Sequence, residues 1–187
     1  MAEAASTQPP VEGDLSCLEL DPLLLRALIQ AVKSGMQMTG SPVAPVGASR
    51  LNNAHHTVTV MLGLVGAHTG NLGLNLSEEA TLHLAGGLLG EPQRDLNEDV
   101  VDAVMEVGNM VAGALKAPLS GTIYSVGNIS LPSLILGKSY AMVYTRGIKS
   151  VSVEFELGDM PFASMRARYF SANVSLLRSA GSHILKP

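Results

Sequence analysis

The sequence predicts an α/β domain of the α+β kind, in which a mainly antiparallel sheet is covered by three helices. Two observations lead to this prediction. Apolar residues recur with helical spacing near residues 22–39, 78–89 and 97–116. Elsewhere, runs rich in β-branched residues partly alternate and are separated by Gly-containing turns, a pattern that favours antiparallel hairpins.

The composition indicates an aliphatic core and excludes several classes of protein. Hydrophobic residues make up 47% of the 187 residues, aromatic residues only 4%, and tryptophan is absent. The length suits one domain, or two small halves that share a core. A net charge of −4 leaves no basic field for nucleic acid.

The single cysteine, Cys17, allows neither a disulfide framework nor a thiolate metal site within one chain, which favours a reducing compartment. The N-terminus lacks the charged and apolar regions of a signal peptide, and no run of 18 apolar residues exists. The sequence therefore predicts a cytoplasmic protein without a membrane or nucleic-acid partner.

The first half of the chain divides at its prolines and glycines. Residues 1–20 lack periodicity and are predicted to form a flexible N-terminal arm. A helix begins at Pro22, and two prolines predict a loop over residues 41–50. Strands at His55–Val65 and Asn71–Leu76, joined by the turn GAHTG, form the first predicted hairpin.

The second half repeats this order of helix and hairpin. Strand-like runs at residues 139–144 and 150–157 predict a second hairpin, and residues 162–169 predict one more strand. The basic residues after them suggest a solvated tail with a short helix. The predicted domain therefore spans residues 21–158, and residues 159–187 add a strand and a C-terminal tail.

The stretch Asn97–Pro118 contains the most informative pattern in the chain. Asn97 is suited to cap a helix, and Pro118 is expected to end it. Spacings of i, i+4, i+7 and i+11 place one apolar stripe on the core side: Val100, Val104, Val107 and Val111.

A second, polar stripe has the same spacing and lies beside small residues. It consists of Asp102, Glu106, Asn109 and Gly113, with Gly108 and Ala112 next to it. Glycine within a helix costs roughly 1 kcal/mol relative to alanine, so two glycines need an explanation. Either another part of the fold packs closely against this helix, or the stripe is a flat surface on which a partner docks.

The spacing D-x3-E-x2-N-x3-G, filled by the four stripe residues, resembles the signature helix of the CheC/CheX/FliY group of chemotaxis phosphatases. Segments 62–91 and 129–144 also resemble that family, and the resemblance covers residues 22–158. CheC-like proteins have pseudo-twofold halves with two E-x2-N sites. This chain has one, since Gln30 and Lys33 occupy the corresponding positions of the first helix, and it is therefore more similar to CheX.

The resemblance implies a phosphatase that hydrolyses the aspartyl phosphate of a CheY-like response regulator. Asn109 would position the attacking water, and Glu106 would pair with the active-site lysine of the regulator. Asp102, Gly113, Gly108 and Ala112 would contact that partner. The resemblance also implies a homodimer and no cofactor of its own, with the Mg²⁺ held by the regulator.

Two other interpretations compete with the phosphatase. The first is a metal site, which is disfavoured because the histidines lack the HxxxH and HExxH spacings of metal sites, and because His55 and His56 would point to opposite faces of a strand. The other alternative is a non-catalytic docking or scaffold module, related to the middle domain of flagellar switch proteins. An intact pair of Glu106 and Asn109 favours the phosphatase.

Overall fold

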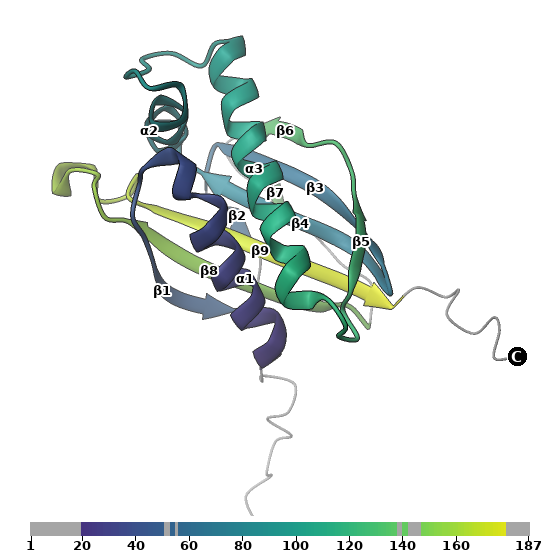
Figure 1. Ribbon diagram of the computed structural model, residues 1–187. Coiled ribbons are helices and arrows are strands. Elements are labelled where there is room, and N and C mark those ends of the chain that lie inside the picture. The colour runs from purple at the N-terminus through teal and green to yellow at the C-terminus, as the bar shows by residue number, and fades with distance from the viewer. Residues whose placement is uncertain (1–19, 51–52, 55, 138–139, 142–146, 179–187) are drawn as a thin grey trace, which may run out of the picture.

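The structure is a computed structural model that describes residues 20–50, 53–54, 56–137, 140–141 and 147–178. Helices α1 (Pro22–Gly35) and α3 (Glu98–Leu119) lie side by side across one face of a large sheet, and α2 (Glu78–Leu89) lies beyond their ends (Figure 1). All three predicted helices are present. The region predicted as the first helix, residues 22–39, consists of α1 and a 3₁₀ turn, η2 (Gln37–Thr39).

Each helix begins at a side chain that caps it. The Asp21 carboxylate accepts hydrogen bonds from the first turn of α1, and the Ser77 hydroxyl accepts one from the N–H of Ala80 in α2 at 3.0 Å. Helix α2 ends at Gly90, whose φ of 80° is the left-handed conformation that glycine adopts readily.

The sheet is antiparallel throughout and has the strand order β1-β8-β9-β4-β3-β5, with β6 also paired to β3. Its strands are β1 (Val43–Ser49), β3 (Val58–Gly66), β4 (His68–Leu76), β5 (Val126–Ile129), β6 (Ser133–Leu136), β8 (Lys149–Leu157) and β9 (Tyr169–Arg178). Two short strands, β2 (Asn53–Ala54) and β7 (Tyr140–Ala141), pair with each other and, among the described residues, with no other strand. The predicted fold class is confirmed.

The first predicted hairpin is present, but its connection is shorter than expected. Strands β3 and β4 flank Ala67 alone, so most of the GAHTG segment belongs to the strands. The predicted loop over residues 41–50 is wrong, because this segment contains the edge strand β1. Its register shifts between Pro45 and Gly47, and a proline without an N–H is tolerated at such an irregular sheet edge.

The second predicted hairpin is also wrong in the part that the structure describes. Strand β7 pairs with β2, residues 142–146 lie outside the described residues, and β8 pairs with β1 and β9. The second hairpin is therefore β8–β9. Residues 162–169 contain the 3₁₀ turn η3 (Phe162–Ser164) instead of a full strand.

Strand β9 lies in the segment after residue 158, where an additional strand and a C-terminal tail were predicted. It lies between β8 and β4 at the centre of the sheet, and its inward residues Phe170, Val174 and Leu176 are fully buried. The expected helical tail is wrong up to Arg178, because the apolar residues follow the period of two that a strand requires. The hairpin β8–β9 thus belongs to the main domain.

The strand order shows the expected pseudo-twofold halves. The first half contributes α1, the edge strand β1 and the hairpin β3–β4, and the second contributes α3, the edge segment β5–β6 and the hairpin β8–β9. Each edge strand pairs with the hairpin of the other half, β1 with β8 and β6 with β3. The two halves are therefore intertwined and share one core.

Burial of the two long helices follows the same symmetry. When Leu24 is aligned with Val100, seven consecutive pairs of core positions are buried in both helices: Leu24/Val100, Ala27/Ala103, Leu28/Val104, Ala31/Val107, Val32/Gly108, Gly35/Val111 and Met36/Ala112. The helices approach closely at one of these pairs, since a Cβ on Gly35 would lie 2.5 Å from Val111 Cα. A residue and its own equivalent thus meet at the pseudo-twofold axis.

Candidate functional surface

Helix α3 carries the polar stripe, and its sequence explains where it begins. Asn97 Oδ1 accepts a hydrogen bond from the Val100 N–H at 2.9 Å, and Glu98 and Asp99 occupy the first turn, where negative charge is favourable. Pro118 does not end the helix as predicted but lies in its last turn. A proline there removes a single hydrogen bond close to a helix end, where carbonyls already turn to water.

The apolar stripe holds α3 against the sheet, as predicted. Each of its members has 0% exposure, and Leu115 continues it: Val100, Val104, Val107, Val111 and Leu115. Burial of an aliphatic side chain of this size stabilises the fold by about 1.5–3 kcal/mol. The stripe therefore fixes the rotation of α3 and directs the opposite side of the helix outward.

The polar stripe lies on that outward side. Asp102, Glu106 and Gly113 are exposed, and Asn109 is half-buried. The side-chain Nδ2 of Asn109 donates a hydrogen bond to Glu106 Oε2 at 3.0 Å. A carboxylate only accepts hydrogen bonds, so the NH₂ of Asn109 must face it. The carbonyl Oδ1 of Asn109 is then left to accept a hydrogen bond from a ligand or water.

The two helix glycines have different explanations. A Cβ on Gly108 would lie 2.6 Å from Val60 Cγ1 of β3, so this glycine allows the helix and sheet to approach each other. A Cβ on Gly113 would meet nothing within 4 Å. Packing within the described chain therefore explains Gly108 but not Gly113.

This burial corrects part of the predicted partner surface. Gly108 is buried against the sheet and Ala112 has 0% exposure, so neither can contact a docked partner. Both lie on the core side of α3, since Gly108 lies four residues after the buried Val104 and Ala112 lies four residues after Gly108. Asp102, Glu106, Asn109 and Gly113 remain, and we call these four residues the α3 stripe.

Other polar clusters have structural roles that sequence reasoning missed. Asp159 Oδ2 lies 2.9 Å from His83 Nε2 of α2 and accepts a hydrogen bond from the Ser41 hydroxyl at 3.1 Å. These residues are far apart in the sequence, so no local pattern could reveal the contact. Among the described residues, no three His, Cys, Asp or Glu side chains are placed to hold a metal ion.

Tyr124 links the start of α1 to the segment that follows α3. Its hydroxyl donates a hydrogen bond to Asp21 Oδ2 at 2.6 Å, and its ring packs at a tilt against His68 with centroids 5.1 Å apart. Burial, together with the bond to Asp21, raises the pKa of Tyr124 to about 12. The Asp21 carboxylate thus caps α1 and also holds Tyr124, in the segment that follows α3.

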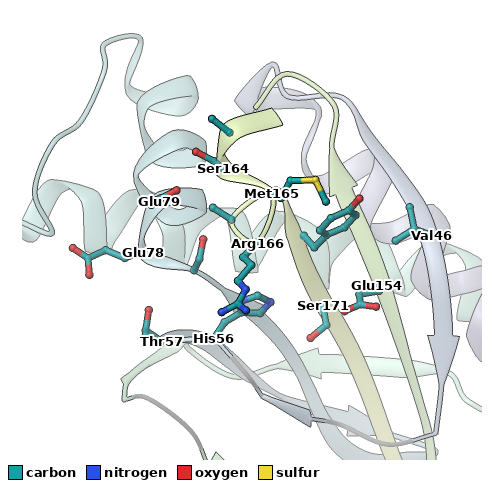
Figure 2. Close-up of a pocket in the computed structure, with 14 residues that line it drawn as sticks. Val46, His56, Thr57, Glu78, Glu79, Glu154, Ser164, Met165, Arg166 and Ser171 are labelled. Carbon is teal, nitrogen blue, oxygen red and sulfur yellow. The ribbon is translucent and has the colours of Figure 1, made fainter. Parts of the chain in front are cut away.

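A well-formed hollow lies away from the α3 stripe. It has a volume of about 960 Å³ and lies between the start of α2, strands β1, β8 and β9, and the loop after η3. Figure 2 shows Arg166 between Glu78 and Glu79 on one side and Glu154 and Ser171 on the other. No residue of α1 or α3 lines it, so the α3 stripe is an open surface and not part of this pocket.

Fold and surface together define an α+β domain with intertwined halves that presents a carboxylate–carboxamide pair on one exposed helix. A family profile described as chemotaxis phosphatase CheX matches residues 58–156, more than half of the chain. The chain therefore belongs to the CheX family. Among the described residues, no helix is both long and apolar enough to cross a membrane.

Solved structures share the fold at low sequence identity. CheX from a subspecies of Desulfovibrio desulfuricans has 19% identity and a TM-score of 0.67, over 82% of this chain and 98% of that one. A CheC-like superfamily protein from Shewanella sp. PV-4 has 19% identity and a TM-score of 0.68, over 84% and 99%. A complex of CheX, CheY, BeF₃ and Mg²⁺ from Borrelia burgdorferi has 20% identity and a TM-score of 0.66, over 85% and 99%. No curated protein matches the chain.

Proposed function

We propose that this protein hydrolyses the aspartyl phosphate of a CheY-like response regulator, using Asn109 to position water and Glu106 to dock on the regulator. One observation carries the proposal: Glu106 and Asn109 are joined by a 3.0 Å hydrogen bond on the outward face of α3, in a chain of the CheX family. The Borrelia burgdorferi relative, which was solved with CheY, BeF₃ and Mg²⁺, supports the choice of partner.

Hydrolysis of an aspartyl phosphate needs positioning more than covalent catalysis. Water attacks phosphorus, the bond from phosphorus to the aspartyl oxygen breaks, and the products are a free carboxylate and inorganic phosphate. The transition state is largely dissociative, so an aligned water supplies most of what a protein can contribute. The free Oδ1 of Asn109 accepts a hydrogen bond from this water. The bond directs a lone pair of the water oxygen towards phosphorus.

Glu106 has two roles in this proposal. It accepts the hydrogen bond from Asn109, which fixes the direction of the carboxamide, and its other oxygen binds the active-site lysine of the regulator. A charge-assisted bond of this kind is stronger than a neutral one and sets the register of the complex. The Mg²⁺ belongs to the regulator, and this chain supplies no metal or other cofactor.

Self-association accompanies this function. The edge formed by β5, β6 and the segment between them exposes apolar side chains, among them Leu131 of that segment at 88% and Leu136 of β6 at 61%. An edge with exposed apolar residues is suited to pair with another chain. We therefore place a homodimer contact there. A protein that sediments as a monomer at 100 μM would contradict it.

The decisive experiment follows the decay of aspartyl phosphate on a CheY-like regulator with the wild type and with Asn109→Ala. We expect the wild type to accelerate the decay, and the substitution to lower the maximal rate by about 10²–10³-fold, as for loss of one preorganised transition-state contact. Binding to the regulator with BeF₃ bound should change little. Equal decay rates for the two proteins would rule out this role of Asn109. Binding without any acceleration by the wild type would instead support the docking module.

A further inference from the structure

Helix α1, together with the first residue of η2, presents a second stripe whose positions align with those of the α3 stripe. The alignment that matches the seven buried pairs places Arg26, Gln30, Lys33 and Gln37 on Asp102, Glu106, Asn109 and Gly113, respectively. All four residues of this α1 stripe are exposed. The fold therefore displays two geometrically related surfaces, one on each side of the pseudo-twofold axis.

The charges of the two stripes are opposite. The α3 stripe carries two carboxylates and no cation, whereas the α1 stripe carries two cations and no carboxylate. In the described part of the chain, Arg26 and Lys33 form no ion pair. Lys33 lies in the last turn of α1, where a cation stabilises the helix dipole. Arg26 lies near the opposite end and has no such benefit.

The α1 stripe cannot repeat the chemistry of the α3 stripe. A lysine ammonium group donates hydrogen bonds but cannot accept one from water, so Lys33 cannot replace the carbonyl oxygen of Asn109. Gln30 also lacks the negative charge with which Glu106 would bind a lysine. Any role of the α1 stripe is therefore recognition and not hydrolysis.

A scaffold with two equivalent helices poses a problem of orientation for a partner that docks across both. Without a difference between the stripes, the partner could bind in two directions related by the axis, and only one would bring its phosphoryl group to Asn109. Opposite charges remove this ambiguity, because the wrong direction places like charges together. Helices α1 and α3 lie side by side and approach closely at Gly35 and Val111, so one partner can contact both stripes.

We propose that the α1 stripe, through Arg26 and Lys33, binds an acidic patch beside the phosphorylation site of the same regulator and sets the direction of docking. The proposal rests on the proposed function. An acidic patch is the partner chemistry that fits, because both charged side chains of the α1 stripe are cations and the phosphoryl group itself lies at Asn109. The active-site lysine of the regulator then contacts Glu106 of α3, and the acidic patch of the regulator contacts Lys33 of α1.

The test uses the full chain with both charges reversed, Arg26→Glu together with Lys33→Glu, and a CheY-like regulator with BeF₃ and Mg²⁺ bound. We expect a Kd at least about tenfold higher at low ionic strength, and a weaker dependence of Kd on salt. In the hydrolysis assay KM should rise by a similar factor with kcat unchanged, because the α1 stripe does not touch the reacting atoms. The control is Arg166→Glu, an exposed arginine in the separate hollow of Figure 2, which should change neither value.

The outcomes separate this inference from the proposed function. If the wild type binds but does not hydrolyse, the proposed function fails, while a weaker Kd for the reversed protein still upholds the α1 stripe. If the wild type hydrolyses and the reversed protein keeps its Kd, KM and salt dependence, the inference is overturned. It is also overturned if the reversal changes only the oligomeric state, since α1 would then contact a second copy. Failure of the wild type to bind any regulator overturns both.

Discussion

Asn109 Nδ2 lies 3.0 Å from Glu106 Oε2, so the two polar residues of the α3 stripe form one hydrogen-bonded unit. A single turn of helix separates them, and the buried valines on the opposite side fix the direction of that turn. This relationship makes the orientation of the carboxamide depend on the group at position 106. Substitutions of Glu106 can therefore separate its effect on the orientation of the Asn109 carboxamide from its effect on binding to the regulator.

Glu106→Gln should weaken docking more than the chemical step. The glutamine carbonyl can still accept the hydrogen bond from Asn109, but the negative charge is lost. We expect KM for the phosphorylated regulator to rise by about tenfold, with kcat changed by less than about threefold, since a charge-assisted bond is worth about 1.5–3 kcal/mol. Glu106→Ala removes both roles, so kcat should fall as well. Steady-state phosphate release measures both parameters, and an identical loss of kcat in the two variants would contradict the alignment role.

The two helix glycines form a matched pair of stability tests. Gly113→Ala should stabilise the protein by about 0.5–1 kcal/mol, because alanine is the better helix former and its Cβ would meet nothing within 4 Å. Gly108→Ala should destabilise it by about 1–3 kcal/mol, because its Cβ would lie 2.6 Å from Val60 Cγ1. Urea unfolding measures both. If the partner approaches the helix at Gly113, the more stable alanine variant should also bind the regulator more weakly.

Gly35→Ala should be more damaging than either glycine substitution in α3. The added Cβ would lie 2.5 Å from Val111 Cα, and a backbone atom cannot move aside as a side chain can. We expect a loss of about 3 kcal/mol or more in the free energy of unfolding, at the upper end of overpacking effects. Ser34→Ala, at the exposed neighbouring position, is the control and should lie within about 0.5 kcal/mol of the wild type. A Gly35→Ala protein as stable as this control would contradict the close helix crossing.

Local sequence patterns predicted the helices and the outward stripe because each depends on residues close in the chain. The caps Asp21, Ser77 and Asn97 bond to N–H groups two or three residues away, and the valine stripe repeats within one helix. Gly108 and Gly113 could not be separated in this way. Only the position of β3 beneath the helix distinguishes a glycine that packs from one that is open.

Strand pairing was harder to predict because it depends on partners far along the chain. Residues 150–157 were correctly predicted as a strand, but the nearest run was taken as its partner, whereas the sheet pairs it with β1 and β9. Strand β9 was missed because Leu176 and Leu177 are adjacent, which obscures the alternation of Phe170, Ala172 and Val174. The intertwined halves explain the wrong pairing of residues 150–157, since the edge strand of each half pairs with the hairpin of the other half.

Tyr124→Phe should reveal a pH-dependent contribution to stability. The folded protein raises the pKa of Tyr124 to about 12, because of burial and then the hydrogen bond to Asp21, from about 10 in an unfolded chain. The unfolded state therefore loses its proton first, so this contribution is fully present below about pH 10 and is lost as the pH rises towards 12. The free energy of unfolding of the wild type should fall more steeply with pH over this interval than that of Tyr124→Phe.

At neutral pH, Tyr124→Phe should cost about 1–2 kcal/mol for the lost bond to Asp21. The difference between the two proteins should then narrow as the pH approaches 12. Urea unfolding at intervals from pH 8 to the alkaline limit of folding measures these differences. A difference between wild type and Tyr124→Phe that stays constant across this range would mean that the hydroxyl proton has the same affinity in both states, which the 2.6 Å bond to Asp21 argues against.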